Sequence, residues 1–272
     1  MFEQYGNLVV GAILIILLAG CSSAATVPPS STPGSTTIPS PTSFPVPELG
    51  SVILQFIGNS CTLSTASDGT RIVSDPYGDY EHPAGIGPLP KDLEADAVTV
   101  SHAHEDHNNS KAVGGSPQVI TEAGIYQIGK IKVTGYAGFE GSPSGPSQNP
   151  HVVFVFEVDG VKIVHMGDSG PITEPDARAA VENADVILFN IDGYVIPAEQ
   201  IVPFLQQVKA RTWIATHYSL REDARWQGAP TIDEFVKNLP SDLPVVRLGS
   251  EIVVTPNMPN QAAVLISRAL RK

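Results

Sequence analysis

Cysteine, cationic residues and long apolar runs are all scarce in this 272-residue chain. Its two cysteines cannot build a disulfide framework, and 16 Lys and Arg residues against 28 Asp and Glu leave a formal net charge of −12. Affinity for nucleic acid comes mainly from Lys and Arg that neutralise phosphates. Because this chain has few of them and a negative net charge, nucleic acid is not an expected partner. No apolar run reaches the roughly 20 residues that a membrane-spanning helix needs. These absences leave a globular protein that acts on a small or neutral ligand.

An export signal is indicated at the N-terminus. Leu8–Leu18 is almost purely apolar and leads into Leu18-Ala19-Gly20-Cys21. This resembles a bacterial lipoprotein signal, although the preceding MFEQYGN contains no Lys or Arg. The resemblance implies cleavage before Cys21, acylation of that residue and anchoring to a membrane outside the cytoplasm. An uncleaved apolar N-terminus is the alternative.

The composition divides the rest of the chain into a tether and one domain. Ser, Thr and Pro dominate residues 22–48, which predicts a disordered linker, whereas residues 49–272 have the composition of a single α/β domain. Asp159-Gly160 between two apolar runs predicts a tight hairpin. Short runs rich in β-branched and aromatic residues predict strands at Val52–Ile57, Arg71–Ser74, Val98–Val100, Val152–Val158, Val161–Val164, Val186–Phe189 and Trp213–Ala215. Helical patterns cover Pro175–Asn183, Pro197–Lys209, Thr231–Asn238, with a capping box from Thr231 to Glu234, and a stretch from about Asn260.

Three histidines and two acidic residues are concentrated in SHAHEDHNN, residues 101–109, directly after an apolar run. His102 and His104 alternate, so an extended chain would direct both imidazoles to the same side. Asp106 and His107 follow across a turn and can face a second point nearby. Imidazole nitrogens and carboxylate oxygens at this spacing suit two adjacent cations. We favour this interpretation over the alternative, a solvated polar loop.

The same stretch resembles the HxHxDH signature of the metallo-β-lactamase fold superfamily. Three further stretches resemble the family's motifs in the expected order: Gly69–Pro76 as an early strand ending in Asp-Pro, His165–Asp168 as a strand-end Gly-Asp, and Ile214–Tyr218 as a late strand ending in His. The resemblance spans about residues 52–254 and is strongest to metal-dependent hydrolases related to ascorbate-6-phosphate lactonases. It implies an αββα four-layer sandwich with a dinuclear metal site at one edge.

The resemblance also implies the ligands. Asp168 fits independently as a bridging ligand, because it ends an apolar strand and a carboxylate can contact two cations; a simple turn aspartate is the alternative. The glycine before it, Gly167, would let the backbone approach the site closely. The implied ligands are His102 and His104 for the first metal, Asp106, His107 and His217 for the second, and Asp168 for both.

One ligand of the first metal departs from the family pattern. Relatives usually carry a histidine shortly after the strand that here begins Ile131–Gly135, whereas this chain continues with Tyr136-Ala137. Three outcomes are open: His151 replaces the ligand, Gln148, Asn149 or water fills its place, or the first site binds metal weakly. We favour His151.

The remaining histidines and Cys61 have simpler interpretations. His165 is expected to be buried and hydrogen-bonded without binding metal, and His82 is expected at the surface or rim. Cys61 lies in an apolar run, so it is expected to be a small buried hydrophobic residue and not a reactive thiol.

These features predict a metal-dependent hydrolase that cleaves an ester, lactone or phosphodiester bond of a small molecule. Two divalent cations, Zn²⁺ or else Mn²⁺ or Fe²⁺, would generate a hydroxide nucleophile, which Asp106 could orient. The substrate is expected between the loops Tyr136–Pro150 and Ile191–Tyr194. A non-catalytic binding lipoprotein with a degenerate first site is the main alternative, and a redox protein is a third. The oligomeric state remains open.

Overall fold

The computed structural model describes residues 45–78, 86–141, 149–170, 172–223, 225 and 229–269. The predicted lipoprotein signal with Cys21, most of the predicted linker, His82 and Gln148 lie outside these ranges. Clustering of contacts places residues 44–272 in one compact unit. Among the described helices, none is long and apolar enough to cross a lipid bilayer.

One mixed sheet contains six described strands. They are β1 (Val52–Gly58), β2 (Cys61–Ala66), β3 (Arg71–Ser74), β4 (Ala97–Thr99), β5 (Gln118–Ile120) and β13 (Glu251–Val254). Their order is β13-β1-β2-β3-β4-β5. Pairing is antiparallel from β13 to β3 and parallel from β3 to β5.

A second mixed sheet contains eight described strands. They are β6 (Gly124–Ile128), β7 (Ile131–Glu140), β8 (Asn149–Val158), β9 (Val161–His165), β10 (Val186–Asn190), β11 (Thr212–Thr216), β12 (Val245–Arg247) and β14 (Gln261–Val264). Their order is β12-β14-β11-β10-β9-β8-β7-β6, parallel from β12 to β9 and antiparallel from β9 to β6.

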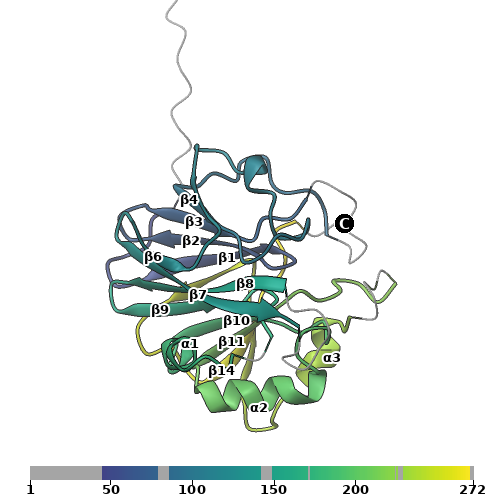
Figure 1. The fold of residues 1–272 in the computed structure, drawn as a ribbon. Coiled ribbons are helices and arrows are strands. Elements are labelled where there is room, and N and C mark those ends of the chain that lie inside the picture. The colour runs from purple at the N-terminus through teal and green to yellow at the C-terminus, as the bar shows by residue number, and fades with distance from the viewer. Residues whose placement is uncertain are drawn as a thin grey trace, which may run out of the picture. The chain divides into compact units, whose positions relative to one another are not determined.

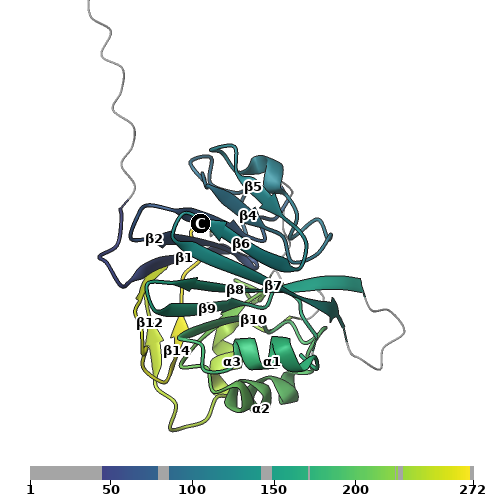
Figure 2. The same ribbon diagram turned by 60° about the vertical axis from the view of Figure 1, so that its left-hand side comes forward.

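The two sheets pack face to face, and the three described α-helices lie on the outer face of the eight-stranded sheet (Figures 1 and 2). These helices are α1 (Pro175–Val181), α2 (Ala198–Val208) and α3 (Ile232–Lys237). The outer face of the six-stranded sheet carries loops and a short 3-10 helix, η1 (Ser110–Ala112). The layers confirm the predicted sandwich of two sheets with helices outside.

Side-chain alternation along the six-stranded sheet separates two cores. In β3, Ile72 belongs to the main core between the sheets, whereas its neighbour Val73 belongs to a smaller core on the outer face. Successive strand residues point to opposite faces, so the inner strands β1 to β4 contribute to both cores, whereas the edge strands β5 and β13 contribute to the main core alone. Cys61 lies fully buried in the smaller core, and burial raises the pKa of its thiol, which confirms its hydrophobic role.

Two local predictions are confirmed and one is wrong. Asp159 (φ 51°) and Gly160 (φ 85°) form the turn between β8 and β9, and Thr231 and Glu234 make a capping box at the start of α3. The predicted helix from about Asn260 is instead β14, which pairs in parallel with β11 and β12. Its alanines allow a helix, but β11 and β12 on either side offer backbone hydrogen bonds to an apolar strand.

Candidate metal centre

Strand ends from both sheets place the predicted ligands at one edge of the sandwich. Just beyond β4, the chain carries His102 to His107, while Asp168 follows β9 and His217 directly follows β11. His217 has a left-handed backbone (φ 53°), and its N–H donates to the carbonyl of Asn59 at 3.0 Å. Few non-glycine residues adopt this conformation, and it turns the chain sharply at the strand end.

Three of the predicted ligands form what we call the second cluster: Asp106, His107 and His217. Nε2 of His217 lies 3.1 Å from Oδ2 of Asp106, and Nε2 of His107 lies 3.5 Å from the same oxygen. Both imidazoles are buried, while the Asp106 side chain is 19% exposed. One imidazole thus comes from the motif after β4 and the other from the end of β11, as the resemblance implies.

A first cluster forms on the other side of Asp168 and contains His102, His104 and Glu140. Nε2 of His102 lies 3.0 Å from Nδ1 of His104, which lies 3.4 Å from Oε1 of Glu140. One potential ligand atom from each of these residues lies within 4.8 Å of the others. Glu140 was missed in the sequence because a lone glutamate in a Gly-rich stretch carries no signal of its own.

Asp168 lies between the two clusters. Its Oδ2 is 3.3 Å from Nε2 of His107, 3.5 Å from Nε2 of His217 and 4.0 Å from Nε2 of His102. Its other oxygen, Oδ1, accepts a hydrogen bond of 2.8 Å from Nδ2 of Asn190 at the end of β10. This position, with one oxygen directed toward both clusters, is the one that a shared ligand requires.

Buried carboxylates and one hydroxyl orient the imidazoles from behind. Nδ1 of His107 donates to Oδ2 of Asp75 at 2.9 Å, which directs Nε2 of His107 toward the clusters. Asp75 also accepts hydrogen bonds from the N–H and Oγ of Ser101, whose hydroxyl lies 3.0 Å from Nδ1 of His102. On the far side, Oδ2 of Asp192 lies 3.4 Å from Nδ1 of His217. Such outer partners commonly fix the tautomer of metal-binding histidines.

The pKa values of the centre are shifted because carboxylates and imidazoles lie close together in a buried environment. Burial alone would lower the pKa of His217, but Asp168, Asp106 and Asp192 raise it to about 9. Burial would raise the pKa of Asp168, yet His107 and His217 hold it well below its usual value. Without other cations, the imidazoles carry the positive charge that keeps these carboxylates ionised.

The donor set fits divalent cations. Nε2 of His107 is fully buried and has no hydrogen-bond partner among the described residues, although two carboxylates surround it. A cation would bind the lone pair of neutral Nε2. Its positive charge would then replace that of the imidazole protons, which in the metal-free chain balance the charge of Asp106 and Asp168. Imidazole nitrogen and carboxylate oxygen suit Zn²⁺, Mn²⁺ and Fe²⁺ alike.

His151, the favoured replacement ligand, lies beside the first cluster but joins none of the metal-capable groups among the described residues. Its ring centroid is 5.4 Å from that of His102, it is 2% exposed, and burial lowers its pKa to about 3. It packs against Gly167 (φ 52°), where a Cβ atom would lie 2.9 Å from Nε2 of His151. The backbone of Gly167 therefore approaches His151 and Ser101 closely, beside the first cluster.

Other sequence expectations have clear outcomes. Tyr136, where the missing ligand was sought, packs against the main core. His165 is buried, and its Nε2 donates to the carbonyl of Ser60 at 2.9 Å, which confirms a hydrogen-bonded role. Asp75, in the predicted Asp-Pro motif, orients ligands, a role that the sequence did not assign.

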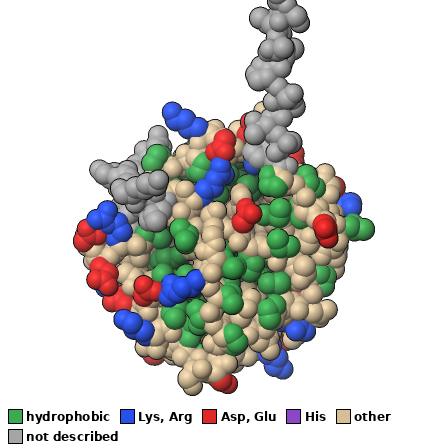
Figure 3. Space-filling model, turned by 180° about the vertical axis from the view of Figure 1, so that it is seen from behind, with side chains coloured by type: hydrophobic (Ala, Val, Ile, Leu, Met, Phe, Trp, Pro, Cys, Tyr) green, Lys and Arg blue, Asp and Glu red, His purple; other side chains and the backbone are tan. Residues whose placement is uncertain are grey.

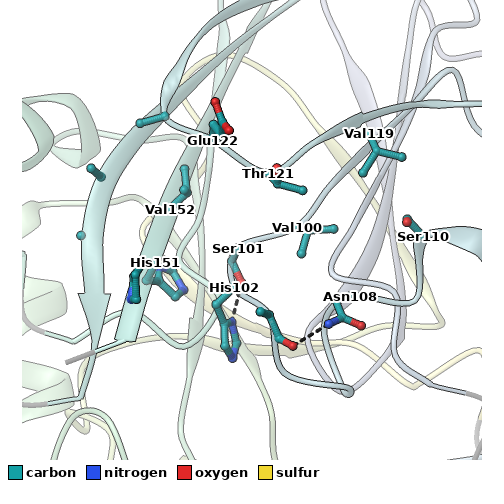
Figure 4. Close-up of a pocket in the computed structure, with 15 residues that line it drawn as sticks. Val100, Ser101, His102, Asn108, Ser110, Val119, Thr121, Glu122, His151 and Val152 are labelled. Carbon is teal, nitrogen blue, oxygen red and sulfur yellow. Dashed lines mark hydrogen bonds between the residues drawn. The ribbon is translucent and has the colours of Figure 1, made fainter. Parts of the chain in front are cut away.

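A cavity of about 630 Å³ opens beside the first cluster (Figure 4). His102 and His151 line one part of it, and Val100, Val119 and Val152 supply apolar walls. No Lys or Arg stands among its described lining residues. Part of the expected loop lines it through Ala137, Gly138 and Pro150, whereas Ile191–Tyr194 does not.

The described surface seen from behind the view of Figure 1 carries no visible histidine (Figure 3). The face drawn in Figure 3 shows hydrophobic side chains interspersed with Lys, Arg, Asp and Glu, and no described histidine is visible on it. Scattered apolar residues of this kind are ordinary for a protein surface. The described groups that could hold a metal lie instead around the edge where β4, β9 and β11 end.

Comparisons with known proteins agree with this geometry. Residues 53–217 match the model of the beta-lactamase superfamily domain. A metal-dependent hydrolase of Natranaerobius thermophilus is 25% identical over 68% of this chain and 89% of its own length, and one of Cupriavidus taiwanensis is 25% identical over 78% and 87%. A solved structure from Thermotoga maritima, assigned as a Zn-dependent hydrolase of the metallo-beta-lactamase superfamily, is 25% identical with a TM-score of 0.60, covering 79% of this chain and 98% of that one. The matched range contains the HxHxDH motif, Asp168 and His217, and the chain therefore belongs to the metallo-β-lactamase superfamily, in which its relatives are named metal-dependent hydrolases.

Proposed function

We propose that this protein is a metal-dependent hydrolase that cleaves an ester, lactone or phosphodiester bond of a small molecule. The observation that carries the proposal is the position of Asp168 between two clusters of imidazole and carboxylate groups. His102 and His104 would hold one cation, Asp106, His107 and His217 the other, and Asp168 both. When bound, such ions, Zn²⁺ or else Mn²⁺ or Fe²⁺, lower the pKa of water and polarise the bond under attack.

The chain's own groups divide the remaining work. Asp75, Asn190 and Asp192 hold ligands in place through hydrogen bonds or close contacts from outside the clusters. At 19% exposed, the side chain of Asp106 is more accessible than that of Asp168, at 7%. We therefore assign to Asp106 the orientation of water and the acceptance of its proton.

The cavity supports a substrate with an apolar part. Its valine walls favour alkyl or aryl groups, and the lack of described lining cations disfavours a polyanionic substrate. The reacting bond would then lie next to His102, where the cavity meets the first cluster. The names of the relatives support hydrolysis, but they do not specify a substrate.

Hydrolysis of a panel of simple esters, lactones, phosphodiesters and β-lactams by the metal-loaded full chain tests this function. We expect activity on at least one class, and Asp168→Asn should lower kcat/KM by more than about 100-fold, beyond the 10–100-fold typical for loss of an outer partner. Asp176→Asn, an exposed change in the first turn of α1, is the matched control. Activity that survives Asp168→Asn would contradict the shared-ligand mechanism. Metal binding without hydrolysis of any class would favour the non-catalytic binding lipoprotein.

We also propose that the protein is anchored to a membrane outside the cytoplasm through an acylated Cys21. The apolar Leu8–Leu18 run, the sequence before Cys21 and the Ser/Thr/Pro-rich segment after it support this location. Cys21→Ser should abolish incorporation of a labelled fatty acid and release the protein from the membrane fraction. Equal labelling of both forms would refute the anchor.

A further inference from the structure

Glu140 is placed beside the metal centre by its backbone. It is the last residue of β7, where it pairs with Asn149 of β8, and it also forms an isolated antiparallel bridge with Ser169. The neighbouring N–H of Gly170 donates to the carbonyl of Phe139 at 2.9 Å. The end of β7 is therefore fixed against the segment that follows Asp168.

Asn149 holds one oxygen of the Glu140 carboxylate, and this directs the other oxygen toward His104. Nδ2 of Asn149 donates to Oε2 of Glu140 at 3.0 Å, and Oε1 lies 3.4 Å from Nδ1 of His104. The side chain is 5% exposed, and among the described residues its ion-pair partner is His104, which is charged only when protonated. A buried carboxylate needs a positive partner, because its desolvation is costly.

We propose that Glu140 is the third ligand of the first metal site, together with His102 and His104. This inference rests on the proposed function, since it completes the same centre. It gives each site two imidazoles and one carboxylate, with Asp168 shared between them. Three carboxylates then offset most of the charge of two divalent cations, whereas a site built with His151 would contain only two.

His151 lies outside the group of potential ligand atoms that His102, His104 and Glu140 form. It pairs with Gly138, two residues before Glu140 on the neighbouring strand, and its Nε2 lies close to the backbone of Gly167. Both of its ring nitrogens lack hydrogen-bond partners among the described residues. These free nitrogens could accept a cation, as at His107, but His151 joins no group of described residues whose potential ligand atoms all lie within 4.8 Å of one another. We therefore assign it to packing beside the ring of His102 on the cavity side.

The ligand type has a consequence for metal choice. Carboxylate oxygen is a harder donor than imidazole, so replacing a histidine by Glu140 shifts the relative preference of the first site toward Mn²⁺ and Fe²⁺. The second cluster has the same ligand types but is more deeply buried. The first site should therefore be the weaker and the more exchangeable of the two.

Titration of the metal-free full chain with Mn²⁺ and with Zn²⁺, followed by equilibrium dialysis, tests the assignment without any substrate. The wild-type chain should bind two ions, and Glu140→Gln should weaken one binding step by at least about tenfold for Mn²⁺. Glu140→His should restore two ions and raise the preference of that step for Zn²⁺ over Mn²⁺. His151→Ala and the exposed control Glu157→Gln should leave both steps unchanged.

The inference is overturned if Glu140→Gln binds both ions as tightly as the wild type, if His151→Ala loses an ion, or if the wild type binds fewer than two. Thermal unfolding of the metal-free variants shows whether each one is folded. Correct metal counts with no hydrolysis of any substrate class would contradict the proposed function alone. Hydrolysis by the wild type, together with equal metal affinity of the wild type and Glu140→Gln, would contradict this inference alone.

Discussion

His104 and His107 stand three residues apart in one motif, yet 52% of the His104 side chain is exposed, whereas that of His107 is fully buried. The difference extends to their clusters. In the second cluster, Asp75 and Asp192 lie behind the imidazoles of His107 and His217. In the first cluster, His104 reaches solvent, and the outer contacts are neutral ones from Ser101 and Asn149.

This comparison indicates a division of labour within one centre. Ligands held rigidly by buried charged partners bind metal tightly, because little reorganisation is needed. Ligands near an open cavity leave room for substrate and for exchange. The second cluster is therefore expected to be the structural anchor of the centre, and the first cluster the part that meets substrate.

The largest effect is expected from His217→Ala. In the metal-free chain, this imidazole lies 3.1 Å from Asp106 and 3.5 Å from Asp168, so its removal leaves buried carboxylates without their partner. The free energy of unfolding should fall by about 3 kcal/mol, as for other broken buried pairs. Urea denaturation of the metal-free protein measures this loss. A change below about 1 kcal/mol would mean that the second cluster does not stabilise the fold.

A more selective loss is expected from Asp75→Asn. The amide keeps the shape of the side chain but removes the charge that fixes the tautomer of His107. Affinity at the second site should fall by about 10–100-fold, while the first site changes less. Competition with a chelator resolves the two steps. Equal weakening of both sites would show that Asp75 acts on the whole centre through Ser101.

His104→Ala should change metal binding with little effect on the fold. Because its side chain is half exposed, metal-free stability should stay within about 0.5 kcal/mol of the wild type. The first binding site should weaken while the second is kept, which is the converse of His217→Ala. Comparing Tm and metal content of both variants side by side gives the sharpest test of the contrast between the clusters.

The smallest effect is expected from narrowing the cavity with Ala137→Phe. Ala137 lines the cavity and has an exposed side chain, so a larger residue should be tolerated by the fold. KM for an apolar substrate should rise by about tenfold, consistent with the modest energies of hydrophobic pocket contacts. Metal content should not change. An unchanged KM across substrates of different size would place the substrate elsewhere.

Local sequence patterns predicted much of the fold. The Asp159-Gly160 turn and the Thr231–Glu234 capping box formed as expected, because each depends on residues close in the chain. The prediction of a helix at Gln261–Val264 was wrong, since its strand character comes from pairing with β11 and β12, which local propensity does not report. The same limit applies to β12, which pairs with that strand.

The sequence by itself determined the motif that contains His102, His104, Asp106 and His107, because these predicted ligands lie within one short stretch of chain and their spacing is a signal. Asp168 and His217 were found through their strand-end motifs. Only the tertiary structure showed that Glu140 groups with His102 and His104 while His151 joins no such group of described residues, because the register of β7 on β8 and the bridge to Ser169 set where each residue lies. A shift of two residues along a strand moves a side chain by about 7 Å, and no single-residue signal records that register.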